Sequence, residues 1–571
     1  MELAGIMIVV IATFAIGTYG VRVARTTSDF FVASRQVGAT MNASAICGEY
    51  ISAASFLGAA GLIMRYGSGM LWLPLAYAAG YLFLLLFVAA PLRRFGAYTV
   101  PDFAEGRLDS LLNRRIAMIF VLAIGWFYLL PQMKGAGLTL TVITGSPYWV
   151  GVVVVGTVIT VNVAIGGMRG ITFVQAFQYW VKVVAIGVPA LIFITFIHHP
   201  NQASLTQPVP PRFANETSVK FDRSVSVEVS EQVRPIGTGV VDGAPLSGPV
   251  DLLPGIHTIG KGTRLTLARG AAVPLVKGTS VNNNERWALP YSLSGDDRPH
   301  PLYANGSLLV AQLLGVMGLP HILVRFYTNS DGHTARRTTL FVLCLLGLFY
   351  IFPAVHGALG RLYAPRLLMT GSADAVVLVL PRLIVGGVAG GILAGLVAAG
   401  AMAAFLSTAS GLLIAVSGAL SQDLLSGSVR DFRRMAMVAG SIAILFGLQV
   451  RDIDLNVLVG WAFGVAASSL CPLLVLGIWW RGLSRRGAAA GMLTGGSLAT
   501  ISVLLTMIGV RPGGWLGAIL SQPAAITAPL GFLVMVLVSR ATTSSVPGAV
   551  SAKMVHLHLP EAIGLGRNWR D

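Results

Sequence analysis

Charged side chains are scarce in this sequence. Asp, Glu, Lys and Arg make up 11% of its 571 residues, whereas soluble domains carry about 25%. A soluble chain of this length would lack the polar side chains needed to cover its cores. The mean hydropathy is +0.75, and apolar runs of about 20 residues, which can cross a bilayer as helices, recur along the chain. The composition therefore excludes a soluble protein and predicts an all-α integral membrane protein.

Cysteine is rare as well, and its placement excludes a disulfide framework or a zinc site. The three cysteines, Cys47, Cys344 and Cys471, lie in separate apolar segments, where they are typical packing residues. The sequence also lacks a phosphate-binding glycine loop, an HExxH zinc motif and a GxSxG motif between a strand and a helix. We therefore predict no catalytic residue, no cofactor, and no ATP-driven pumping by this chain alone.

Acidic residues are too few to balance the basic ones, because 23 Asp and Glu face 40 Lys and Arg. The arginines do not gather on one arm, as in a nucleic-acid binder, but lie in short loops such as those at Arg93–Arg94 and Arg336–Arg337. Every second loop is rich in arginine, which is the positive-inside pattern. This alternation predicts a multi-pass protein of the cell membrane with an extracellular N-terminus, a cytoplasmic C-terminus and no nucleic-acid partner.

Hydropathy predicts about 13 spans, interrupted by one polar insertion. The spans cover about 3–21, 40–64, 70–92, 115–144, 148–165, 171–197, 304–327, 337–360, 382–421, 432–450, 455–480, 486–509 and 516–539. The polar residues 198–303, placed outside the cell by this topology, contain short strand patterns at 224–229 and 263–267. The insertion is either a partly ordered loop or a module that collects substrate or binds a partner.

The second and ninth spans carry polar groups at mid-membrane depth. Glu49 lies among small and hydroxyl residues, and Gly48 and Gly58 allow the helix to unwind. Unwound backbone exposes carbonyl oxygens that can bind an alkali cation, although a close-packed interface of small residues gives the same pattern. Ser407 and Thr408 are adjacent hydroxyls in an Ala-, Gly- and Leu-rich helix. They could complete a sodium site or bond to carbonyls of their own helix.

Basic residues inside other spans leave more alternatives open. In the fourth span, Lys134 follows Gln132 and could either snorkel to the membrane surface or meet an anionic substrate. For Lys182 in the sixth span we favour snorkelling. The glycines and proline of GVMGLPH (315–321) predict a broken seventh span. Arg325, four residues later, could gate, anchor to lipid headgroups or contact substrate.

Eight motifs follow one another in an order and spacing that indicate a known family. They are DFFVASR (29–35), GEYISAASFLGAAGL (48–62), PLRRFGAYTVPDF (91–103), GLPHILVRFYT (318–328), FLSTASGLL (405–413), SQDLL (421–425), AASSLCPLL (466–474) and IWWRGLSRRGAAAGM (478–492). In these motifs the chain resembles the sodium/solute symporter family, and within it the cation/acetate (monocarboxylate) branch. The resemblance covers about 29–197 and 304–540.

This resemblance implies a core of two five-helix inverted repeats whose first and sixth helices are broken. The chain then divides into an extra first span with its loop, the first repeat, the insertion, the second repeat, and two extra spans with a tail: 1–39, 40–197, 198–303, 304–480 and 481–571. The implied sodium ligands are the carbonyls of Gly48, Ile51 and Ala404 and the hydroxyls of Ser407 and Thr408. Sodium is the only metal ion predicted.

The implied substrate site lies beside the two broken helices. Its residues are Tyr50, Ser52, Ser55, Gln132, Gln312, Met317 and Trp461. Glu49 stands where the acetate-like branch has aspartate, and Glu49 and Lys134 are our candidates for coupling.

The predicted function is uptake of a short monocarboxylate, such as acetate, propionate or pyruvate, coupled to inward movement of sodium (or protons). One alternative is a symporter for another small solute such as proline. Another is a transporter-like membrane sensor that uses the 198–303 insertion. The sensor is disfavoured because only about 30 residues follow Arg540, fewer than a typical output domain needs.

Overall fold

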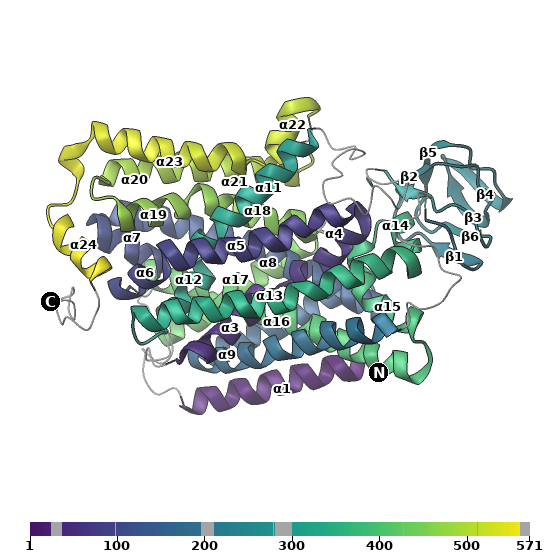
Figure 1. Ribbon diagram of the computed structural model, residues 1–571, viewed down its shortest axis with the longest axis horizontal. Helices are drawn as coiled ribbons and strands as arrows, with labels where there is room; N and C mark the ends of the chain where they lie inside the picture. The colour runs from purple at the N-terminus through teal and green to yellow at the C-terminus, as the bar shows by residue number, and fades with distance from the viewer. Residues whose placement is uncertain are drawn as a thin grey trace.

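Long apolar helices packed side by side form most of the structure, and a small β-sheet lies at one end of the bundle (Figure 1). The computed structural model describes residues 1–23, 37–195, 211–279 and 300–559, apart from positions 98, 278, 426–427, 452, 454 and 511. The predicted motif at 29–35 lies outside the described residues. The N-terminus lies at the same end of the bundle as the sheet, and the last helix, α24, lies at the opposite end (Figure 1).

The first half of the chain forms α1 to α9. Their bounds are α1 Glu2–Val23, α3 Ala39–Tyr50, α4 Ala59–Tyr66, α5 Trp72–Phe87, α6 Ala89–Phe95, α7 Val100–Leu108, α8 Leu111–Thr144 and α9 Tyr148–Thr195. Local sequence explains several ends. Thr99 and Asp102 form a reciprocal capping box at the start of α7, and Gly145 ends α8 in the left-handed conformation, with φ 71°.

The second half forms α11 to α24. Their bounds are α11 Pro301–Gly315, α12 Pro320–Phe326, α13 Gly332–Tyr363, α14 Arg366–Thr370, α15 Val376–Ile384, α16 Gly387–Leu424, α17 Val429–Gly447, α18 Leu455–Ser468, α19 Leu470–Trp479, α20 Arg485–Gly491, α21 Ser497–Met507, α22 Gly514–Ser521, α23 Ala524–Ala541 and α24 Val550–His558. The most apolar part of α16 is 78% buried, against 33% for α23, so α16 is a central helix of the bundle.

The helices confirm a multi-pass membrane protein. Among the described residues, nine helices are long and apolar enough to cross a bilayer, or eleven if each of two bent pairs counts as one span. The two remaining predicted spans correspond to α1 and α17. The apolar part of α1 is shorter, at Glu2–Thr18, and α17 begins with the charged stretch VRDFRR. The predicted total of 13 therefore stays a prediction.

Two predicted spans are broken within their length. The axes of 39–50 and 54–66 differ by 71°, and those of 302–318 and 320–326 differ by 41°. In the first pair, Ile51 leaves the helical conformation at φ −71° and ψ 88°, and a short π-helix at Ala54–Gly58 follows. In the second, Leu319 is extended and Pro320 begins α12, since proline suits the first turn of a helix.

The insertion contains a seven-stranded antiparallel sheet in the order β1-β6-β3-β5-β2-β7, with β4 paired to β3. The strands are β1 Thr217–Lys220, β2 Val225–Val229, β3 Ile236–Val241, β4 Ala244–Pro249, β5 Gly255–Ile259, β6 Arg264–Leu267 and β7 Leu275–Val276. The predicted strands at 224–229 and 263–267 are thus confirmed as β2 and β6. The sheet touches the bundle through Arg223, which donates to the carbonyl of Gly371 at 3.1 Å.

Candidate functional site

The break between α3 and α4 directs backbone carbonyls toward α16. Because Ile51 departs from helical geometry, the last carbonyls of α3 lose their partners in the helix. The Thr408 hydroxyl on α16 donates to the carbonyl of Glu49 at 2.5 Å. The neighbouring Ser407 hydroxyl lies 3.2 Å from the carbonyl of Ala404. The structure therefore brings the hydroxyl pair and the broken helix together, and their binding of sodium stays a prediction.

A lysine from α9 reaches the same carbonyls. The Lys182 ammonium donates to the carbonyl of Gly48, to that of Ile51 at 2.7 Å and to the Ser407 hydroxyl at 2.7 Å. Its side chain is fully buried. The prediction that Lys182 snorkels to the membrane surface is therefore wrong. A charged residue in mid-span was the signal for an inward-facing functional group, but one span alone does not tell which face turns inward.

An ion pair joins the same end of α3 to α12. Arg325 Nε lies 2.7 Å from Glu49 Oε2, and both side chains are 1% exposed. The guanidinium also donates to Thr172 Oγ1 at 2.7 Å and to Gln175 Oε1, both on α9. This burial excludes lipid-headgroup anchoring, one of the three alternatives for Arg325, and leaves gating and substrate contact as predictions. Sequence reasoning did not predict that Arg325 pairs with Glu49. Glu49 is one of our two candidates for coupling, and the ion pair holds its carboxylate in place.

Glycine on α16 makes room for that carboxylate. A Cβ atom added at Gly411 would lie 1.7 Å from Glu49 Oε1, closer than any non-bonded contact allows. Gln175 Nε2 donates to the carbonyl of Ser407 at 2.8 Å. Gln175 on α9 thus links the Glu49–Arg325 ion pair to Ser407 on α16, the residue whose hydroxyl accepts from Lys182.

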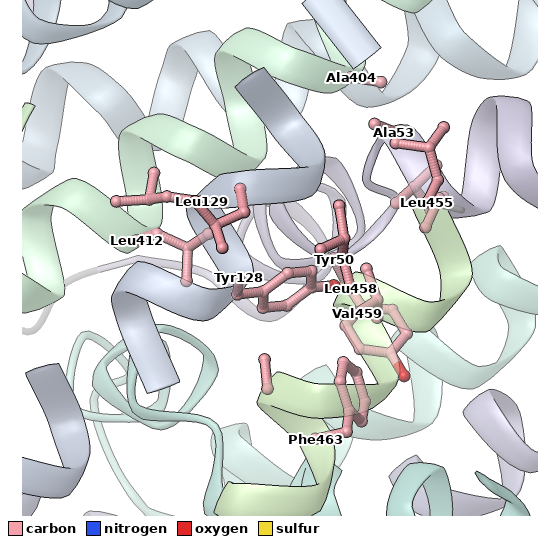
Figure 2. Packing of buried hydrophobic residues seen from close by; sticks show 14 of the residues in the cluster. Tyr50, Ala53, Tyr128, Leu129, Ala404, Leu412, Leu455, Leu458, Val459 and Phe463 are labelled. Atoms are coloured by element: carbon pink, nitrogen blue, oxygen red, sulfur yellow. The ribbon is translucent and has the colours of Figure 1, made fainter. Parts of the chain in front are cut away.

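Aromatic rings surround the side chain at the end of α3. The Tyr50 ring meets those of Tyr77 and Tyr81 edge-on, with centroids 5.8 and 4.7 Å apart. Phe463 on α18 lies 6.3 Å from Tyr50 and 5.5 Å from Tyr128 on α8. Figure 2 shows the rings of Tyr50, Tyr128 and Phe463 close to one another, on α3, α8 and α18. Such a mainly apolar enclosure with a few polar groups is typical of a small-molecule site.

All seven predicted substrate residues are at most 3% exposed. Ser55 Oγ lies 3.0 Å from the hydroxyl of Tyr350, and the amide N–H of Ala53 donates to Gln132 Oε1 at 3.0 Å. These contacts place Ser55 and Gln132 beside the break, and Ser52 lies within it, between Tyr50 and Ala54. Gln312 is on α11, Met317 is in the 3₁₀ turn that follows it, and Trp461 is on α18, two residues before Phe463 and so on roughly the opposite side of that helix.

Some buried polar atoms in this region have no protein partner. Among the described residues, the hydroxyls of Tyr50 and Tyr81 and Nε1 of Trp461 lack a hydrogen bond. Buried polar groups are nearly always bonded to protein, water or ligand. These atoms are therefore available to a polar ligand or to water.

Lys134 lies away from the polar and aromatic residues that surround the break between α3 and α4. Its ammonium donates to the carbonyl of Ile453 at 2.5 Å and to Asp374 Oδ2 at 3.2 Å. It lines a cavity of about 340 Å³ between the sheet and the bundle. The charged residues lining this cavity are mostly basic: Lys134, Lys220, Arg223, Arg366 and Arg451, with Asp222 and Asp374.

Membrane-spanning helices, two of them broken beside a buried polar centre, define the protein as a membrane transporter. The family model of the sodium:solute symporter family matches residues 30–209 and 281–495, and the chain belongs to this family. The resemblance predicted from the motifs is thus confirmed, as is the prediction of a transporter, not an enzyme. The stretch between the two matched parts contains the β-sheet.

Relatives match nearly the whole chain. The uncharacterized symporter YwcA of Bacillus subtilis is 28% identical over 540 residues, covering 91% of this chain and 90% of the relative. The monocarboxylic acid transporter of Corynebacterium glutamicum is 27% identical over 544 residues, covering 90% and 87%. A solved sodium-coupled sialic acid symporter, in a substrate-bound outward-open state, has the same fold, with a TM-score of 0.62, 14% identity and coverage of 94% and 98%.

Proposed function

We propose that this symporter takes up a short monocarboxylate, such as acetate, propionate or pyruvate, together with an inward-moving cation, sodium or a proton. The observation that supports the substrate class most directly is the match, along both halves of the chain, to the monocarboxylic acid transporter of Corynebacterium glutamicum. The broken helices and the aromatic rings around Tyr50 form a small buried centre, and it is there that we place the substrate.

The chemistry of that centre suits a small carboxylate. The unpartnered hydroxyls of Tyr50 and Tyr81 are donors for carboxylate oxygens. The rings of Tyr50, Tyr81 and Phe463 offer apolar contact to a short alkyl group. In our proposal, rocking of the helix bundle around this centre opens it to each side of the membrane in turn.

We also propose an entry route through the cavity beneath the sheet, with the insertion on the outer face of the membrane. A cleft lined mostly by positive charge raises the local concentration of anions. Replacing Arg366, which lines it, by Gln should raise the KM for uptake at low salt and have less effect at high salt, because salt screens exposed charges. Arg269→Gln, at an exposed position in the turn after β6 and outside the cavity lining, is the control.

The function is tested with purified protein in proteoliposomes. Uptake of radiolabelled acetate, pyruvate and proline is measured under a sodium gradient, under a proton gradient and without either, with protein-free liposomes as blanks. We expect gradient-driven accumulation of acetate or pyruvate that an excess of the unlabelled acid suppresses. Accumulation of proline alone would refute the substrate class, and no accumulation under any gradient would refute symport of these solutes.

A further inference from the structure

The cation site implied by the family resemblance is already filled by a side chain of this protein. Three of its five predicted ligands, Gly48, Ile51 and Ser407, accept hydrogen bonds from the Lys182 ammonium. We propose that this ammonium is the resident cation of the site, and that a sodium ion does not bind there. The proposal concerns the coupling cation and so rests on the proposed symport function.

The Lys182 ammonium matches the site in its number of hydrogen-bond donors and in its charge. A lysine ammonium has three N–H donors, and the three acceptors from α3 and α16 use all of them. In our proposal the amine is protonated and so carries, like sodium, a single positive charge. A second cation among the same oxygens would meet that charge at a few ångströms in a buried setting, where repulsion between like charges is strong.

The other two predicted ligands already have hydrogen-bond partners within the protein. The Thr408 hydroxyl donates to the carbonyl of Glu49 at 2.5 Å, and the carbonyl of Ala404 lies 3.2 Å from the Ser407 hydroxyl. The nearby charges of Glu49 and Arg325 pair with each other at 2.7 Å. The Lys182 ammonium therefore supplies the positive charge that these carbonyls require, in the place of an exchangeable ion.

A cation that is part of a side chain cannot leave the site, and in this it differs from an exchangeable sodium ion. A sodium ion leaves the site when the protein releases its cargo, whereas the lysine stays attached to α9. It holds the broken end of α3 against α9 and α16 without any ion from solution. A sodium ion that drives uptake would have to bind elsewhere in the protein.

The test measures saturable binding of radioactive sodium to purified full-length protein. Lys182→Met keeps a long side chain and removes the charge, which frees the oxygens of Gly48, Ile51 and Ser407. We expect Lys182→Met to bind more sodium than the wild type, and the double variant Lys182→Met/Ser407→Ala to lose that gain. Lys261→Met, at an exposed position in the turn between β5 and β6, is the matched control and should bind sodium as the wild type does.

Two outcomes would overturn the proposal. One is a well-folded Lys182→Met protein that binds no more sodium than the wild type. The other is a wild type whose sodium binding falls when Ser407→Ala is introduced with Lys182 in place. The second arm needs no change at Lys182, so it decides the matter even if Lys182→Met misfolds. Absence of monocarboxylate uptake under every gradient would refute the proposed function and leave both binding arms decisive.

Discussion

The ion pair between Glu49 and Arg325 offers a quantitative test of the packing around the broken helix. Both side chains are 1% exposed. Replacing Glu49 by Gln keeps the size of the side chain and removes its charge. The guanidinium would then keep only neutral partners, among them Thr172 and Gln175. Removing one partner of a buried ion pair costs about 3–5 kcal/mol, because the other charge is left uncompensated.

The matched control is the same substitution in an exposed ion pair. Glu231 pairs with Arg212 at 2.6 Å, but the two side chains are 48% and 43% exposed. Exposed pairs contribute about 0–1 kcal/mol, so Glu231→Gln should leave stability nearly unchanged. The double variant Glu49→Gln/Arg325→Met should recover part of the loss, because it removes the orphaned charge.

The assay is equilibrium unfolding of the full-length protein in mixed detergent micelles, with helicity followed as denaturing detergent is added. We expect the free energy of unfolding to fall by several kcal/mol for Glu49→Gln, in the range given above, and to change little for Glu231→Gln. If Glu49→Gln is as stable as Glu231→Gln, the reasoning about the buried pair is wrong.

Three further predictions follow from single contacts. Gly411→Ala should destabilise the protein by about 1–3 kcal/mol in the same assay, because the new methyl would meet a carboxylate oxygen at 1.7 Å, whereas Gly418→Ala on the same helix meets nothing within 4 Å and should not destabilise it. Tyr50→Phe should raise the KM for uptake while leaving unfolding unchanged, since it removes only an unpartnered hydroxyl; an unchanged KM would exclude that hydroxyl from substrate binding. In the sheet, burial opposes the charged form of His257, but its hydrogen bond to Asp242 at 2.7 Å outweighs burial and raises the pKa of His257. The resulting stabilisation is complete below the unfolded pKa of about 6.5 and is lost as pH rises through the higher folded value; Asp242→Asn should lower the His257 pKa in an NMR titration, and an unmoved pKa would contradict this.

Local sequence patterns predicted much of the fold because they reflect local physics. Apolar length identified the spans, since a helix needs about 20 such residues to cross the bilayer. Alternating Val residues at 225–229 identified a half-buried strand, and they are buried in β2. The glycines and proline of 315–321 indicated a break, and α11 and α12 are separate helices there.

The pairing of side chains between different helices of the bundle could not be predicted in the same way. Glu49 and Arg325 are 276 positions apart in the chain, and no local pattern links them. Lys182 was expected at the membrane surface because a long basic side chain can reach it from many depths. Which face of α9 turns inward depends on how α3 and α16 pack against it.

By itself, the sequence determined that this chain spans a membrane and which family of transporters it belongs to. It also determined the positions at which the second and seventh spans break. Those properties depend on composition, on helix-breaking residues and on short motifs, all of which are local. Only the tertiary structure decided which side chains meet at the break: that Arg325 pairs with Glu49, and that the Lys182 ammonium lies on the carbonyls of Gly48 and Ile51. A buried charge must find its compensation in three dimensions, and its partners are set by helix packing instead of by neighbours in the chain.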